Sequence, residues 1–175
     1  TDTPFAAPYA TDAEIAKVFN ISQNYCIGNM APKITIRNNG SENLTSLEIV
    51  YSVNEGTPLT YNWSGNLSFL ESETIQLEET DFTVLEINTL EIIAGSPNGE
   101  DDDYAANNLR ILEIEQAPAA ESPVSLILKL DDDPEETSWE VIDSQGSVLY
   151  EGSDYTQPGQ IIVEQFEVED SDCYT

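Results

Sequence analysis

The sequence predicts an all-β protein built from β-sandwich modules in tandem, and three observations lead to that fold class. Apolar and polar side chains alternate along segments such as 33–37 and 46–53, with the two-residue period of a half-buried strand. Asn, Gly, Asp and Pro cluster between these segments at the short spacing typical of sandwich folds. Each such strand has one apolar face, which a second sheet has to cover.

The best-defined strands come early in the chain. Alternation over 33–37 ends at Asn39-Gly40, two residues that tolerate the positive φ of a tight turn. A longer strand is predicted up to residue 53, the segment 54–56 turns it, and a third strand runs over 59–67. We expect these three strands to form the centre of the first module.

The outer strands of this module are less regular. Residues 13–19 fit either a short helix with Asp12 as its N-cap or an edge strand. We favour the strand, because the sandwich otherwise lacks an outer one. The remaining predicted strands cover residues 74–77, residues 82–93 with a break near Asn88, and residues 109–115.

Composition changes divide the chain into two modules. Residues 1–116 are expected to form the first, with an extended arm over 1–12, and the Pro- and Ala-rich stretch 117–123 indicates a semi-stiff linker. Residues 124–175 hold four predicted strands, with 173–175 as the start of a fifth. A segment this short buries little apolar surface for an independent sandwich. We therefore expect the second module to be incomplete and the sequence to stop within it.

The charge balance excludes whole classes of function. The chain has 34 acidic and 5 basic residues and no histidine, for a formal net charge of −29. It should therefore repel nucleic acids and anionic lipids, whose phosphates need Lys and Arg. No apolar run approaches the roughly 20 residues needed to insert into a membrane. Without histidine, Ser-His-Asp and Cys-His sites and His-ligated zinc cannot form, which argues against an enzyme.

Two acidic loops are candidate calcium sites, because calcium takes six to eight oxygen ligands from carboxylates and carbonyls. The sharper one holds Asp131, Asp132, Asp133, Glu135 and Glu136, and the weaker one holds Asp101, Asp102 and Asp103. Neither loop has EF-hand spacing. The alternative is a solvated acidic turn at the end of a strand.

Cysteines and aromatic residues leave further alternatives open. Cys26 and Cys173 could form a disulfide, but the sequence does not establish that they pair. Tyr61 with Trp63, or Trp139 with Tyr150, could stack on sugar rings, although their strand positions favour the sandwich core.

Several short motifs occur in a fixed order along the first module. They are Pro32-x-Ile34-x-Ile36-x-Asn38-Asn39-Gly40, Leu44-Thr45-Ser46-Leu47 with Tyr51-Ser52-Val53-Asn54, Trp63-Ser64-Gly65-Asn66-Leu67, and Pro97-Asn98-Gly99 ahead of the acidic run and Asn107-Asn108. On these motifs the module resembles the CARDB-like, immunoglobulin-type adhesion modules of secreted and surface proteins of Bacteroidota. The segment 130–141 with Gly146 and Cys173-Tyr174 looks like a repeat that often follows such modules in large exported proteins.

The resemblance implies tandem immunoglobulin-like sandwiches in a non-catalytic adhesion segment of a large bacterial protein. Such a segment would be secreted or held at the cell surface after export by the type IX route. It would space other modules and contact neighbouring modules, other surface proteins or glycans. Two alternatives stay open: a homo-oligomeric or filament subunit completed by strand exchange, and an accessory region of a secreted hydrolase.

Overall fold

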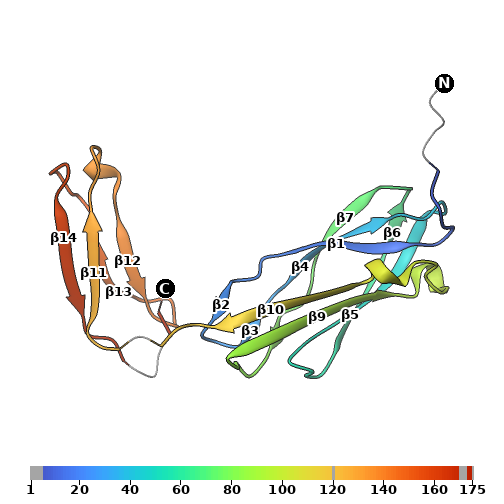
Figure 1. The fold of residues 1–175 in the computed structure, drawn as a ribbon, viewed down its shortest axis with the longest axis horizontal. Helices are drawn as coiled ribbons and strands as arrows, with labels where there is room; N and C mark the ends of the chain where they lie inside the picture. The colour runs from blue at the N-terminus through green and yellow to red at the C-terminus, as the bar shows by residue number, and fades with distance from the viewer. Residues whose placement is uncertain (1–5, 120, 170–172, 175) are drawn as a thin grey trace. The chain divides into compact units, whose positions relative to one another are not determined.

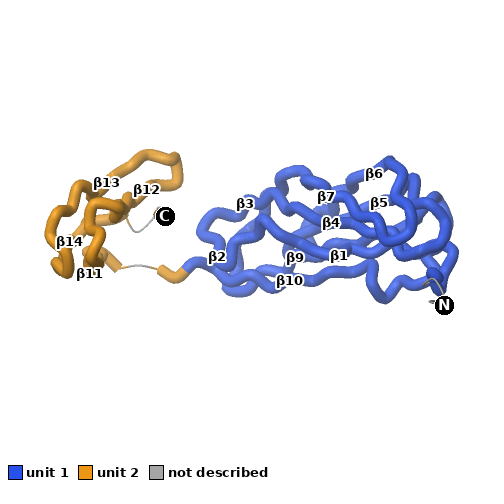
Figure 2. The backbone as a smooth tube through the Cα atoms, turned by 90° about the horizontal axis from the view of Figure 1, so that it is seen from above, with its two compact units in different colours: residues 1–117 blue, residues 118–175 orange. Residues whose placement is uncertain are grey.

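Strands make up nearly all of the regular structure (Figure 1), so the predicted all-β fold class is confirmed. The computed structural model describes residues 6–119, 121–169, 173 and 174. The first five residues of the expected arm, one linker residue and four residues near the C-terminus therefore lie outside the described part. The chain divides into unit 1, Thr1–Ala117, and unit 2, Pro118–Thr175 (Figure 2).

Unit 1 contains two main sheets. The three-stranded sheet has the order β1-β4-β7, with strands Ala13–Phe19, Lys33–Asn38 and Ser72–Gln76. The five-stranded sheet has the order β2-β10-β9-β5-β6, with strands Asn24–Tyr25, Leu109–Gln116, Ile87–Gly95, Leu44–Val53 and Leu59–Leu67. A short pair joins β3 (Asn29–Met30) to β8 (Thr80–Asp81). The pair β2–β10 is parallel, and the other pairs are antiparallel.

Alternation along the strands builds the core of unit 1. Ile34 and Ile36 of β4 are both 0% exposed, and the polar residues that alternate with them, Lys33, Thr35 and Arg37, are half-buried. Each isoleucine that is fully buried in this way contributes about 1.5–3 kcal/mol. Other large core residues include Ile15, Leu47, Ile49, Tyr51, Trp63, Ile75, Leu77, Leu90, Ile92 and Ile114.

Residues 13–19 form the outer strand that the alternation favoured. β1 pairs with β4 from Ala13–Asn38 to Phe19–Lys33, with one irregularity between Ile15 and Lys17. The turn predicted at 54–56 is also present. Asn54 and Glu55 both have positive φ, and the amide of Gly56 donates to the carbonyl oxygen of Val53 at 2.9 Å.

The prediction of one long strand over 82–93 is wrong in its first half. β8 ends at Asp81, residues 82–86 form a loop, and β9 begins at Ile87. Asn88, where the break was expected, lies inside β9. Its buried side chain bonds the loop, as described below, so the loop does not need to pair as a strand.

Unit 2 is much smaller and consists of two antiparallel strand pairs. β11 (Val124–Lys129) pairs with β14 (Ile161–Phe166), and β12 (Trp139–Ile142) pairs with β13 (Val148–Gly152). Two rings of the second pair, Trp139 and Tyr150, pack on Phe166 of the first with centroid distances of 5.2 and 4.8 Å. Cys173 and Tyr174 are not in a strand, so the expected start of a fifth strand is wrong for those two residues.

Among the described residues the helical elements are three short turns: η1 (Pro97–Gly99), η2 (Ala105–Asn107) and η3 (Pro134–Glu136). Within the residues that the structure describes, no helix has the length and apolar character needed to cross a membrane. The first two of these turns lie at the end of unit 1 where β1 begins, since Asn107 bonds Asp12.

Candidate binding site at one end of unit 1

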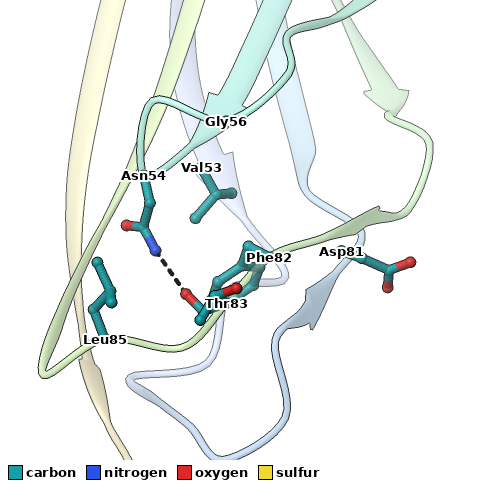
Figure 3. Close-up of a pocket in the computed structure, with 7 residues that line it drawn as sticks. All are labelled: Val53, Asn54, Gly56, Asp81, Phe82, Thr83 and Leu85. Atoms are coloured by element: carbon teal, nitrogen blue, oxygen red, sulfur yellow. Dashed lines mark hydrogen bonds between the residues drawn. The ribbon is translucent and has the colours of Figure 1, made fainter.

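Two neighbouring hollows lie where the β5–β6 turn meets the loop 82–86. The first, about 630 Å³, is drawn in Figure 3 and is lined by Val53, Asn54, Gly56, Asp81, Phe82, Thr83 and Leu85. The second, about 550 Å³, shares Asn54, Gly56 and Leu85 with the first and extends over Ser52, Glu55, Pro58, Ile87, Thr89 and Glu91. We call the two together the loop-end hollow.

Two asparagines hold the walls of the loop-end hollow in place. The Asn54 side-chain amide donates to the Thr83 carbonyl oxygen at 3.0 Å and to the Asn88 carboxamide oxygen at 2.9 Å, and the Asn54 oxygen accepts from the Thr89 amide at 2.9 Å (Figure 3 draws the bond to Thr83). Asn88 bonds both the amide and the carbonyl of Leu85, at 2.8 and 2.9 Å. The turn and the loop are therefore fixed to the sheet before any partner arrives.

The lining of the loop-end hollow is partly aliphatic and partly acidic. Leu85 and Ile87 are 49% and 57% exposed, and carboxylates stand beside them at Asp81, Glu55 and Glu91. Phe82 is half-buried and makes an edge contact with Tyr25, with ring centroids 5.7 Å apart. The described lining includes no His, so it forms no Ser–His or Cys–His pair, and Ser52 lies opposite Glu91 across β5 and β9.

The aromatic pairs considered for sugar stacking lie in the cores, as their strand positions favoured. Trp63 is 4% exposed, and Tyr61 packs partly buried against the same core. Trp139 and Tyr150 pack on Phe166. Trp63 therefore presents no open face to a sugar ring, and Trp139 and Tyr150 are half-buried.

The acidic run 101–103 has a role that sequence reasoning missed. The Asp103 carboxylate accepts hydrogen bonds from the amides of Ala10 and Thr11 at 3.1 and 3.0 Å, and Asp102 accepts from the amide of Ala13 at 2.9 Å. Asp103 therefore holds the end of the N-terminal arm, and Asp102 holds the first residue of β1. Asp101 beside them is exposed. The one signal for these bonds in the sequence is general: the backbone amides of an arm outside any sheet need hydrogen-bond acceptors.

The loop with Asp131, Asp132, Asp133, Glu135 and Glu136 is a solvent-exposed turn. All five side chains are exposed, and one Asp131 oxygen accepts from the Asp133 amide at 3.0 Å. Within the described ranges, no three or more Asp, Glu, Cys or His side chains are grouped as metal ligands. The loop is thus not a preformed site, and a metal would have to draw its carboxylates together. Calcium binding stays a prediction.

Asp12 is a buried acid whose surroundings affect its ionisation. It is 4% exposed, and the Asn107 side-chain amide donates to it at 2.8 Å. Burial raises the pKa of Asp12 above its ordinary value of 3.8, and the charges of Asp102 and Glu14 raise it further. Glu14 also forms an ion pair with Arg110 at 3.3 Å.

The cysteines lie in different units. Cys26 directly follows β2, Cys173 lies near the C-terminus, and neither is a free thiol. Two cysteines without a histidine cannot make a structural zinc site, so they add no metal candidate.

Comparison with solved structures gives the fold of unit 1. The crystal structure of the CARDB domain of the PF1109 protein from Pyrococcus furiosus, in complex with di-metal ions, matches with a TM-score of 0.50 and 13% identity. The match covers 66% of this chain and 95% of that chain. A solution NMR structure of the same domain matches with a TM-score of 0.46 and 14% identity, over 61% of this chain and 94% of that chain.

Comparisons of the sequence alone found no similar protein. No family model matches the chain, and no curated protein matches it. The similarity is therefore one of fold: the chain shares the β-sandwich of a CARDB domain.

Proposed function

We propose that this chain is a non-catalytic structural and adhesion segment of a large secreted or cell-surface bacterial protein. It spaces other modules and contacts a partner through the loop-end hollow of unit 1. The observation that carries the proposal is the Asn54–Asn88 network, which fixes an exposed, partly apolar hollow at one end of unit 1. A preorganised surface of this kind loses little entropy on binding.

The chemistry of the hollow favours a protein partner over a glycan. Exposed Leu85 and Ile87 offer aliphatic surface of the kind that protein interfaces bury. Glycan sites rely on exposed aromatic faces, and the one ring that lines the hollow, Phe82, is half-buried against Tyr25.

The setting of the segment is also part of the proposal. The resemblance in the first module supports an extracellular or cell-surface location and export by the type IX route, with neighbouring modules or other surface proteins as partners. Calcium is the cation that we propose, on the five carboxylates of the 131–136 loop. The similar CARDB domain, which was solved with di-metal ions, adds a reason to test this.

The test is a selection of peptides from a random phage-displayed library against the 175-residue chain. Enriched peptides should bind wild type about tenfold or more tightly than Leu85→Asp, which places a charge in the hollow. Leu70→Asp is the matched control, since Leu70 is an exposed leucine of unit 1 outside the lining, and it should bind like wild type.

Equal binding to both variants would overturn the assignment of the hollow. A preference for cellohexaose or chitohexaose, seen as amide shifts of residues 82–89, would replace the protein partner by a glycan. Cleavage of casein or of these oligosaccharides by the chain would overturn the non-catalytic role and support the hydrolase alternative.

The filament alternative has one specific observation in its favour. Both sheets of unit 2 have only two strands in the described part of the chain, so each strand has a side without a partner strand. Strand exchange between copies could complete them. Against it stands the formal charge of −29 on every copy, which repels a second copy.

A further inference from the structure

Unit 2 contains an apolar groove that the spacing role does not use. It has a volume of about 280 Å³ and lies between β11 and β12. The residues that line it are Val124, Ser125, Leu126, Trp139, Glu140, Val141, Phe166, Val168 and Tyr174. A groove lined in this way gains free energy when apolar side chains displace water from it.

The strands beside the groove have unpaired backbone edges. Within the described residues, β11 pairs with β14 alone and β12 pairs with β13 alone. Three consecutive residues of β11, 124–126, and three of β12, 139–141, line the groove. Because successive side chains point to opposite faces of a strand, the groove borders both strands and touches both faces of each. Exposed backbone N–H and C=O groups beside an apolar groove are the arrangement that an added strand completes.

The negative charge of unit 2 indicates which side chains an added strand would carry. Residues 118–175 contain fifteen Asp and Glu residues, one lysine and no arginine. One of the acids, Glu140, lines the groove itself and is exposed. An extended segment points alternate side chains to opposite faces, so its apolar residues can enter the groove while Lys or Arg residues face the acidic surface. A second copy of this chain would bring more negative charge instead.

We propose that the groove binds an extended segment of a partner protein as an added β-strand, with apolar and basic residues alternating along it. The segment pairs its backbone with the free edge of β11 or β12 and places its apolar side chains over Trp139, Phe166 and Leu126. The groove and the loop-end hollow belong to different units, so a failure at one of them leaves the other unaffected.

The first test uses a synthetic peptide of about eight residues in which Lys alternates with Val, a common strand length. Its binding to the 175-residue chain is measured by isothermal titration and by amide hydrogen exchange. Val141→Lys puts a charge into the groove and should weaken binding about tenfold or more. The control Val163→Lys makes the same change on an exposed position of β14 outside the groove and should bind like wild type.

A second pair of variants covers the case in which Val141→Lys fails to fold. Glu140 and its cross-strand partner Glu151 are both exposed, but only Glu140 lines the groove. Glu140→Lys should weaken peptide binding several-fold more than Glu151→Lys, although both change the net charge equally. Amide exchange in 124–129 or 139–142 should slow when the peptide is bound.

Three results would overturn the proposal. One is equal binding to the groove variants and their controls, which would mean attraction by net charge alone. Another is equal binding of a peptide of the same composition with its lysines and valines in separate blocks, since blocks cannot alternate between groove and solvent. The third is concentration-dependent self-association of the chain that Val141→Lys abolishes, which would make a second copy the occupant.

Discussion

Asp12 shows how one buried carboxyl group couples the N-terminal arm to the body of unit 1. Its side chain accepts a hydrogen bond from Asn107, and its backbone carbonyl oxygen accepts from the amides of Asn39 and Gly40 at 2.8 and 3.1 Å. Burial and the charges of Asp102 and Glu14 make ionisation of this group costly in the folded protein.

Asp12→Asn should therefore stabilise the chain at neutral pH. Because the folded pKa of Asp12 lies above 3.8, the native state binds the extra proton, and wild-type stability falls as pH rises through the interval between the two pKa values. Asparagine keeps the acceptor for Asn107 and carries no charge. We expect equal stability at low pH and a higher stability of Asp12→Asn at pH 7, measured by urea unfolding.

The control for this prediction is Asp101→Asn, which removes one charge from an exposed position in the same region. It should show at most the small, salt-sensitive gain of a relieved surface repulsion. A loss of stability in Asp12→Asn at neutral pH would contradict the assigned cause of the raised pKa.

At the scale of single residues, the sequence predicted which side chains are buried but not which hydrogen bonds they make. Alternation identified the inward positions of β4 because it depends on residues two apart. The bonds from Asp102 and Asp103 to the arm join residues about ninety positions apart, and a run of acids looks the same whether it holds backbone amides or faces solvent.

At the scale of an element, the loop 82–86 is the informative case. Its apolar residues Phe82, Val84 and Leu85 predict a strand by composition, yet the loop pairs with no strand. The backbone of Leu85 is satisfied by the Asn88 side chain instead. Sequence reasoning treats asparagine as a strand breaker, so it placed the break at the residue that makes the loop possible.

Asn88→Ala should destabilise unit 1 by about 2–3 kcal/mol, because it removes the partner of the Leu85 amide and carbonyl and one of the two acceptors of the Asn54 side-chain amide, in a partly buried setting. Hydrogen exchange of residues 82–86 should accelerate more than that of the core strands. Guanidinium unfolding gives the first quantity, and exchange measured by mass spectrometry gives the second.

Asn66→Ala serves as the control, since its exposed side chain accepts one bond, from Asn43 at 3.0 Å. It should cost less than about 1 kcal/mol. Equal losses in the two variants would show that the Asn88 network does not hold the loop.

At the scale of the whole chain, composition and length predicted the division into two units. The expected boundary near residues 117–123 followed from Pro- and Ala-rich composition, and the two units of the structure meet at residue 117. The thin second module was also foreseeable, because its length limits its core. The groove between β11 and β12 was not, since it depends on which strand edges remain unpaired.

Sodium chloride should raise the thermal midpoint of unfolding, because it screens the repulsion among 34 acidic residues.

At fixed ionic strength, calcium should raise the midpoint by several degrees relative to chelator, equivalent to about 2.7 kcal/mol at a hundred times its Kd. Differential scanning calorimetry measures both. The calcium increment should vanish in Asp131→Asn/Asp133→Asn and persist in Asp101→Asn.

If the midpoint in calcium equals that in sodium at matched ionic strength, the 131–136 loop is a salt-adapted surface. That outcome would agree with its exposed, ungrouped carboxylates and would remove calcium from the proposed function.

The path of the chain through unit 1 has a consequence for how it carries tension. β1 begins at the end where Asp12 bonds Asn107, and β10 leaves at the opposite end, where Gln116 pairs with Tyr25 (Figure 1). A pull on both ends of the unit therefore acts along the strands. The β1–β4 bonds are then loaded together in shear rather than broken one by one, and the Asp103 bonds to the arm take the load first.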